Sequence, residues 1–176
     1  MRPAGAEGAA TADATTQTTP DGDELAPRPF NAEQIRAATP AGRSYRFRVE
    51  NQDGSVRLLQ MTFMRVDERG ATLQQAMYDA DGKPAGQAQT SEVTWPELVG
   101  HANYPREATV ISDARIETPA GAFDCMLYTV TEQVDGRTQV TRAYFARELP
   151  GAPVVMRIEV AGQPMISMTL VEHRPQ

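Results

Sequence analysis

The strongest constraint on the fold is a run of short, β-prone segments separated by turn signals, between residues 108 and 172. The segments are rich in branched and aromatic side chains, which favour extended backbone. Glycine and proline interrupt the run at intervals and mark tight turns. The four turns are Thr118-Pro119-Ala120-Gly121, Asp135-Gly136, Leu149-Pro150-Gly151-Ala152-Pro153 and Ala161-Gly162. Because the connections are this short, the five expected strands must pair with their neighbours in antiparallel fashion.

The N-terminal half of the chain carries further strands and two short helices. The expected strands cover residues 45–50, 56–66, 71–78 and 87–93, and the expected helices cover residues 30–42 and 94–102. Each helix begins with a capping box, in which the N-cap side chain and the side chain three residues later each accept a hydrogen bond from the other's backbone amide. Asn31 and Gln34 form the first box, and Thr94 and Glu97 form the second. Helices this short are stable only when they dock against an apolar surface.

Together these segments predict a mainly β fold of about eight or nine strands in a meander. An open sheet of this width twists until it curls. We therefore expect a single, strongly curved antiparallel sheet, either a half-barrel or a nearly closed barrel, with both short helices packed on its concave side. This β domain is expected to cover residues 28–176. Residues 1–27 are expected to form a disordered tail of Ala, Thr, Gly and Pro, because they have little apolar surface to bury.

The charge balance of the chain excludes several partners. Asp and Glu total 23 against 17 Lys and Arg, which gives a formal net charge of -6. Nucleic acids and anionic membrane surfaces attract clusters of positive charge, so we expect neither as a partner. No stretch of the sequence reaches the roughly 20 apolar residues that a membrane-spanning helix needs, so we expect no transmembrane span.

Catalytic and metal-binding residue types are scarce. The chain has one cysteine and two histidines. Cys125 is interpreted as a small buried side chain within a strand, and neither histidine has the spacing to a second metal ligand. We therefore expect no metal site, no cofactor and no enzyme activity. An enzyme would need the few polar side chains to converge in one pocket. Those side chains are His101, Tyr104, Tyr128 and Asp124.

Methionine is the one residue type that is unusually frequent. The chain has eight methionines, against five phenylalanines and one tryptophan. The methionines on expected strands are Met61, Met64, Met77, Met126, Met156, Met165 and Met168. Flexible methionine side chains fill gaps in ordinary cores, and they also line surfaces that bind varied apolar partners. Core filling is the simpler interpretation, and a binding surface is the alternative.

The C-terminal third resembles a family of uncharacterised bacterial exported proteins. The resemblance is carried by Glu117-Thr118-Pro119-Ala120-Gly121-Ala122-Phe123, Ala143-Tyr144-Phe145-Ala146 and Leu149-Pro150-Gly151-Ala152-Pro153-Val154. The family pattern is TPAGTF, then an aromatic-rich strand, then lPV; this chain has Ala122 in place of the threonine and Tyr144 in place of the usual tryptophan. Members are mostly secreted proteins or lipoproteins, with antiparallel folds similar to the lipoprotein-localisation (Lol-type) carriers. The resemblance implies a fold and an exported location, and it supplies no catalytic residues.

Two functions follow as hypotheses. The first is a non-enzymatic exported protein that binds an apolar ligand, such as a lipid or an acyl chain, in the concave face of the sheet. The side chains expected to line that site are Met61, Phe63, Trp95, Met126, Tyr128 and Met156. The second is an envelope scaffold or protein-interaction module with no small-molecule site, whose partner would be an envelope protein. In either case we expect a monomer.

The location is predicted from the N-terminal segment. Segments of this composition often follow the lipidated cysteine of bacterial lipoproteins, so the protein is expected to be periplasmic or tethered to the outer membrane by a lipid anchor on its precursor. An ordinary disordered leader on a cytoplasmic protein is the alternative, and the sequence leaves both open.

Overall fold

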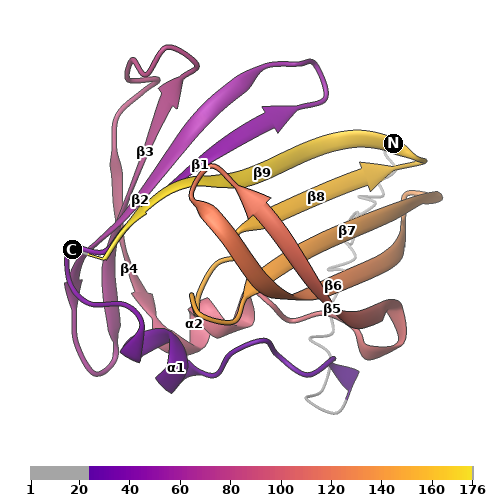
Figure 1. The fold of residues 1–176 in the computed structure, drawn as a ribbon, viewed down its shortest axis with the longest axis horizontal. Coiled ribbons are helices and arrows are strands. Elements are labelled where there is room, and N and C mark those ends of the chain that lie inside the picture. Colours follow the sequence, from indigo (N-terminus) through magenta and orange to yellow (C-terminus); the bar gives the residue numbers. More distant parts are fainter. Residues whose placement is uncertain (1–23, 176) are drawn as a thin grey trace, which may run out of the picture.

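The computed structural model describes residues 24–175 as one curved sheet with two short helices at one end (Figure 1). The helices are α1 (Ala32–Ala37) and α2 (Trp95–Gly100), and a 3-10 turn covers Arg106–Ala108. The strands are β1 (Ser44–Asn51), β2 (Val56–Val66), β3 (Gly70–Asp79), β4 (Gln89–Thr94), β5 (Thr109–Thr118), β6 (Gly121–Val134), β7 (Arg137–Ala146), β8 (Val155–Val160) and β9 (Gln163–Arg174).

The nine strands of the described chain form a single sheet in the order β4-β3-β2-β1-β9-β8-β7-β6-β5. Every neighbouring pair is antiparallel. The prediction of a mainly β fold with a curved antiparallel sheet and two short helices is therefore confirmed. The order contains one non-local pairing, between β1 and β9, and it leaves β4 and β5 at opposite edges of the sheet although they are consecutive in the chain. If the chain began at β5, ran through to β9 and then continued from β1 to β4, its strands would form a simple meander.

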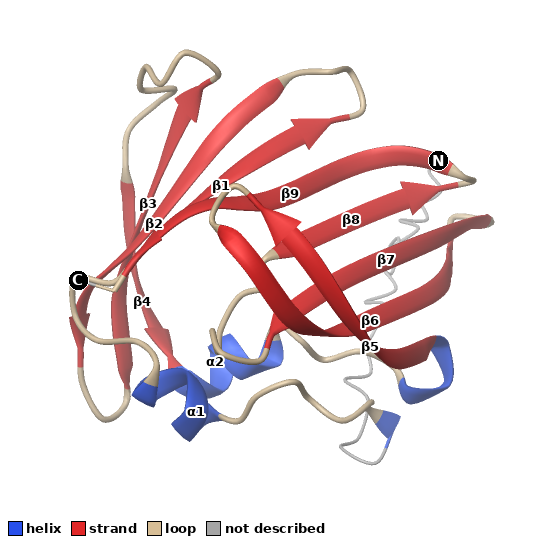
Figure 2. Ribbon diagram, viewed as in Figure 1, coloured by secondary structure: helices blue, strands red, loops and turns tan. Residues whose placement is uncertain are grey.

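The sheet curls strongly, yet in the described chain its edge strands β4 and β5 do not pair with each other (Figure 2). The accumulated twist between neighbouring strands produces this curl. It brings the ring of Phe123, at the start of β6, to 6.3 Å from the ring of His173, near the end of β9. Two strands, β7 and β8, lie between β6 and β9 in the sheet order. The C-terminal half of the sheet is therefore curved almost back onto itself.

The core is assembled from cross-strand partners, because residues directly opposite one another project from the same face of a sheet. Phe47 on β1 lies opposite Leu59 on β2 and Leu170 on β9. Phe47 is 1% exposed and Leu170 is 0% exposed. The non-local pairing of β1 with β9 thus holds two of the most deeply buried side chains at the centre of the sheet.

Both helices begin where their capping boxes predict. The Asn31 side chain accepts a hydrogen bond from the Gln34 amide at 2.8 Å, and the Gln34 side chain accepts one from the Asn31 amide at 2.9 Å. In α2 the Glu97 carboxylate accepts from the Thr94 amide at 2.7 Å, and the Thr94 hydroxyl accepts from the Glu97 amide at 3.3 Å. Both helices are short, and among the described residues no helix is long and apolar enough to cross a membrane.

Strand β6 buries side chains from both of its faces. Phe123 and Cys125 are buried near its start, and Tyr128 and Val130 are buried further along. Because side chains alternate along a strand, these two pairs project from opposite faces. A strand buried on both faces is usually central, but β6 lies next to the edge strand β5. The Phe123 ring lies 6.3 Å from the His173 ring on β9, and the Tyr128 ring lies 5.3 Å from the Phe145 ring on β7, so different parts of the chain cover the two faces of β6.

The folded domain begins before the expected tail ends. Leu25 forms an isolated β-bridge with Pro105, and the Ala26 amide donates to the Tyr104 carbonyl at 2.8 Å. Both Leu25 and Ala26 are buried. These contacts offset the entropy cost of ordering the short stretch that precedes α1. The prediction of a disordered tail otherwise concerns residues 1–23, which lie outside the described residues.

Candidate functional site

A cavity of about 290 Å³ lies on the concave side of the sheet, between the strands and the two helices. Strand residues form the largest part of its wall: Tyr45, Met61, Phe63, Leu73, Gln75, Phe145, Met156 and Met168. The helices and the segments that follow them add Ile35, Thr39, Leu98, His101, Ala102 and Tyr104. The loop before β8 completes the wall with Gly151, Ala152 and Pro153.

The strand register places these side chains together. Tyr45 lies opposite Met61 in the β1–β2 pair, and Met156 lies opposite Met168 in the β8–β9 pair. Such partners project from the same face of the sheet, and here that face is the concave one. Helix α1 reaches the same space through Ile35, which is its buried residue. The cavity is thus bounded by elements that are far apart in the sequence.

The lining is predominantly apolar. Met61, Met156 and Met168 contribute thioether side chains, which adapt to irregular apolar shapes. Among the described residues, no Asp, Glu, Lys or Arg lines the cavity. An interior of this kind accommodates an apolar molecule readily, and it does not contain a pair of carboxylates for acid–base chemistry.

The polar side chains at the wall have different environments. The Thr39 hydroxyl is buried and donates to the Ile35 carbonyl at 2.6 Å. Gln75 and His101 are exposed, so the cavity opens to solvent beside them. Tyr45 is only 6% exposed, and its hydroxyl oxygen accepts a hydrogen bond from Arg43 Nε at 2.7 Å. Tyr45 therefore supplies a buried hydroxyl to a predominantly apolar wall.

Both tyrosines at the wall remain neutral at physiological pH. Burial raises the pKa of Tyr45 above its ordinary value of 10.0, although the charge of Arg43 and its hydrogen bond lower the pKa in part. Burial also raises the pKa of Tyr104, and the negative charge of Glu132 raises it further. Neither hydroxyl is activated as a nucleophile, and each can act as a hydrogen-bond donor.

Three of the six side chains predicted to line the site are at this cavity: Met61, Phe63 and Met156. Phe63 is buried, and the two methionines are partly buried. The structure brings these three together, and a role for them in binding stays a prediction.

The other three predicted side chains, Trp95, Met126 and Tyr128, do not line the cavity. Trp95 is 3% exposed, and its Nε1 donates to the Asp67 carbonyl at 3.1 Å, so it anchors α2 to the turn between β2 and β3. Met126 packs against the core without reaching the cavity. The Tyr128 hydroxyl donates to the Pro27 carbonyl at 2.5 Å and so ties β6 to the N-terminal segment.

The polar side chains that an enzyme would require lie in different places. His101 and Tyr104 are at the cavity, and the Tyr128 ring lies behind the wall, 5.8 Å from the Tyr104 ring. Asp124 lies on the surface, where it pairs with Arg115 at 2.8 Å. In residues 24–175, no group of three His, Cys, Asp or Glu side chains is placed to hold a metal ion.

The six side chains predicted to line the site did not include Tyr45, Phe145 or Met168, although Met168 is one of the strand methionines for which a binding surface was the alternative. Tyr45 and Phe47 alternate with Arg46 and Arg48 in the sequence, which indicates only that both project from the buried face. Alternation identifies the face of a strand, but it does not show which part of that face meets a helix and which part borders a space. That distinction depends on where α1 and α2 dock.

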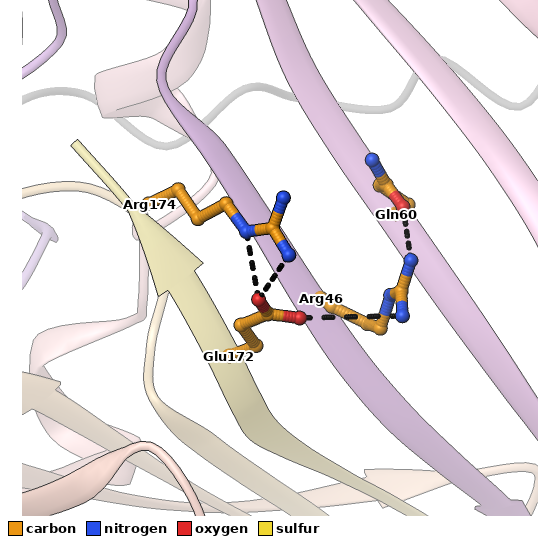
Figure 3. A network of polar contacts seen from close by, with 4 residues as sticks. All are labelled: Arg46, Gln60, Glu172 and Arg174. Carbon is orange, nitrogen blue, oxygen red and sulfur yellow. Dashed lines mark hydrogen bonds and ion pairs between the residues drawn. The ribbon is translucent and has the colours of Figure 1, made fainter. Parts of the chain in front are cut away.

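The outer face of the same strands carries a polar network instead (Figure 3). Arg46 donates to Gln60 on the neighbouring strand at 2.7 Å and lies 4.0 Å from the Glu172 carboxylate. Arg174 pairs with the same carboxylate at 2.7 Å. All the charged side chains in this network are more than one-third exposed, so solvent screens the ion pairs and each contributes little stability.

Comparison with known proteins identifies the fold but no family. The sequence matches no known family profile and no curated protein. Two solved structures have similar folds. One is a protein from Bacteroides fragilis that was predicted to be exported and has a YmcC-like fold, with 12% identity, a TM-score of 0.50, and coverage of 77% of this chain and 97% of the other. The second is a protein from Parabacteroides distasonis that was predicted to be a lipoprotein, with 10% identity, a TM-score of 0.52, and coverage of 84% and 98%.

This chain therefore shares its overall fold with a bacterial protein described as YmcC-like. At these identities the likeness concerns the fold alone. It agrees with the general part of the sequence resemblance, an antiparallel fold like that of uncharacterised exported proteins. Neither solved structure is described as a Lol-type carrier.

Proposed function

We propose that this protein binds an apolar small molecule in the cavity on the concave side of its sheet and catalyses no reaction. The observation that supports this most directly is the lining, which combines three methionines with buried aromatic side chains and contains no carboxylate among the described residues. Ligand sites are commonly apolar hollows with a few polar groups that fix orientation. This cavity has that composition.

The volume limits the size of the ligand. A cavity of about 290 Å³ is roughly twice the ~150 Å³ that admits benzene. A molecule with on the order of a dozen non-hydrogen atoms would fill it, which corresponds to a single medium-length hydrocarbon chain. The flexibility of Met156 and Met168 would allow chains of slightly different shape.

We also propose that the protein is exported and acts in the bacterial envelope. Both proteins of similar fold were predicted to be exported or lipoproteins. The sequence resemblance to exported proteins and Lol-type carriers supports the same location and an acyl chain as the ligand. Fractionation of cells that express the full-length protein tests this location: recovery in the envelope fraction supports it, and recovery in the cytoplasmic fraction contradicts it.

Titration calorimetry with 1-decanol tests the binding proposal. Ala152 is half-buried in the cavity wall, so Ala152→Phe would place a ring in the space that a ligand needs. We expect decanol to bind the wild type and the Ala152→Phe variant to lose at least tenfold in affinity. Ala80→Phe, in an exposed turn, is the matched control and should leave the affinity unchanged. Equal decanol affinities of the wild type and the Ala152→Phe variant would disprove ligand binding in this cavity.

A second candidate function, a protein-interaction module, is favoured by edge strand β5. Val110 is 67% exposed and Ile111 is 40% exposed, and an edge strand also offers unpaired backbone groups. If β5 binds an envelope protein, Val110→Asp should abolish its capture from an envelope extract and leave decanol binding unchanged. Equal capture by the wild type and Val110→Asp would exclude β5 as the interface.

A further inference from the structure

The hydroxyl group of Tyr45 has an unused hydrogen. Its oxygen accepts a hydrogen bond from Arg43 Nε at 2.7 Å, and no described residue accepts a hydrogen bond from it. A phenol can donate one hydrogen bond while its oxygen accepts another. Tyr45 is 6% exposed, and a buried donor without an acceptor is costly. A hydrogen bond from the Tyr45 hydroxyl to an incoming acceptor group would therefore contribute more binding free energy than the same bond at the protein surface.

Gly151, which has no side chain, lies beside the Tyr45 hydroxyl at the cavity wall. A Cβ atom at Gly151 would lie 3.9 Å from the Tyr45 hydroxyl oxygen, and both residues line the cavity. Gly151 has a φ of 141°, which side-chain-bearing residues rarely adopt. The loop before β8 thus leaves space beside the hydroxyl at this point.

The charge near Tyr45 is positive. The Arg43 guanidinium lies 5.3 Å from the centre of the Tyr45 ring as well as hydrogen-bonding to its hydroxyl. Within the described chain, no carboxylate lies within ion-pair distance of Arg43. Because no acidic side chain lines the cavity either, this positive charge is not neutralised locally. An anionic acceptor would be favoured over a neutral one.

We propose that the ligand is a medium-chain carboxylic acid, bound as its carboxylate against the Tyr45 hydroxyl, with its hydrocarbon chain against Met156 and Met168. Arg43 does not line the cavity and acts through Tyr45, because its guanidinium holds the hydroxyl and supplies positive charge behind it. This inference rests on the proposed function and names the chemical class of the ligand. It assigns Tyr45 to recognition of the head group, with Arg43 as its positioning residue, and the methionines to the chain. A hydrogen bond that involves a charged group contributes more than a neutral one, so the head group is expected to affect affinity clearly.

Calorimetric titration with two probes of the same chain length, decanoate and 1-decanol, tests the assignment. We expect the wild type to bind decanoate at least tenfold more tightly than decanol. Tyr45→Phe should reduce decanoate affinity at least tenfold and change decanol affinity less than twofold. The substituted ring would keep the contacts of Tyr45 with Phe47 and Phe63, whose ring centres lie 6.3 Å away, so the variant should fold. A thermal melt checks this.

Two further variants keep the test decisive. Arg43→Gln removes the positive charge and should reduce the preference for decanoate over decanol, even if Tyr45→Phe proves unstable. Tyr78→Phe removes a tyrosine hydroxyl outside the cavity and serves as the control, with no loss of that preference. If decanol and decanoate bind equally well and respond equally to Tyr45→Phe, the carboxylate assignment is wrong while the proposed function stands. If neither probe binds the wild type, the proposed function fails as well.

Discussion

At the scale of single residues, Gly70 has the most severe steric requirement in the sheet. It begins β3 and lies opposite Thr94, the last residue of β4. A Cβ atom at this position would lie 1.9 Å from the Val93 carbonyl oxygen, which is backbone and cannot rotate away. Only glycine allows the two strands to approach this closely.

We therefore predict that Gly70→Ala destabilises the protein by about 1–3 kcal/mol, the usual cost of forcing a methyl group into a packed site. Gly100→Ala is the matched control, because a Cβ there would meet only the Asn103 side chain at 3.7 Å. Gly100 ends α2, so alanine should leave stability unchanged or raise it by up to about 1 kcal/mol. Urea denaturation measures both variants. Equal stability of Gly70→Ala and the wild type would mean that β4 is not docked as described.

At the scale of elements, the two helices have the same capping box built with different chemistry. The box of α1 uses the neutral side chain of Gln34, and the box of α2 uses the carboxylate of Glu97. Hydrogen bonds from the Thr94 amide and hydroxyl lower the pKa of Glu97 below its ordinary value of 4.5. The carboxylate therefore stabilises the fold above the pKa of the unfolded chain, and this contribution is lost as pH falls through the lower pKa of the folded state.

We predict that Glu97→Gln reduces the loss of stability on acidification below pH 4.5. The glutamine keeps the capping hydrogen bond but does not titrate, so the difference between the variant and the wild type should shrink or reverse at low pH. The reciprocal change, Gln34→Glu, should introduce the same pH dependence at α1. Thermal melts between pH 3 and pH 7 provide the measurement. Parallel pH profiles for the wild type and Glu97→Gln would contradict the prediction.

At the scale of the whole molecule, the first and last strands of the chain, β1 and β9, pair with each other in the middle of the sheet. The sheet edges are β4 and β5, which are consecutive in the sequence. Strands β1 and β9 each have two neighbours, whereas β4 and β5 have one. The side chains that β1 and β9 share, Phe47 and Leu170, are almost fully buried. Local stability against opening should therefore be highest at the β1–β9 pair and lowest at the edge strands β4 and β5.

We predict that amide hydrogen exchange is slowest in β1 and β9 and at least about 100-fold faster in β4, because edge amides open without disrupting the core. Exchange of a dilute sample, followed by mass spectrometry or NMR, measures this. The same experiment at higher concentration tests the expected monomer. Protection of β4 or β5 that increases with concentration would show that a second copy covers an edge strand, contrary to that expectation.

Much of the local structure could be predicted because its causes lie within a few residues. The boxes at Asn31 and Thr94 fix both helix starts through hydrogen bonds that span three residues. The turns at Asp135-Gly136 and Ala161-Gly162 join their strands through two-residue connections, with positive φ at all four residues. Antiparallel pairing and the fold class followed from these short connections.

The tertiary structure alone decided the pairing of β1 with β9, the position of β6 beside an edge, and the cavity. Ser44 and Arg174 lie far apart in the sequence yet are paired, and no local pattern encodes such a contact. Met61 and Met126 have similar sequence surroundings as strand methionines, but only Met61 reaches the cavity. The sequence by itself determined which residues are extended and which faces are apolar. Where the apolar faces meet depends on the curl of the sheet and the docking of the helices, because packing involves all the facing side chains together.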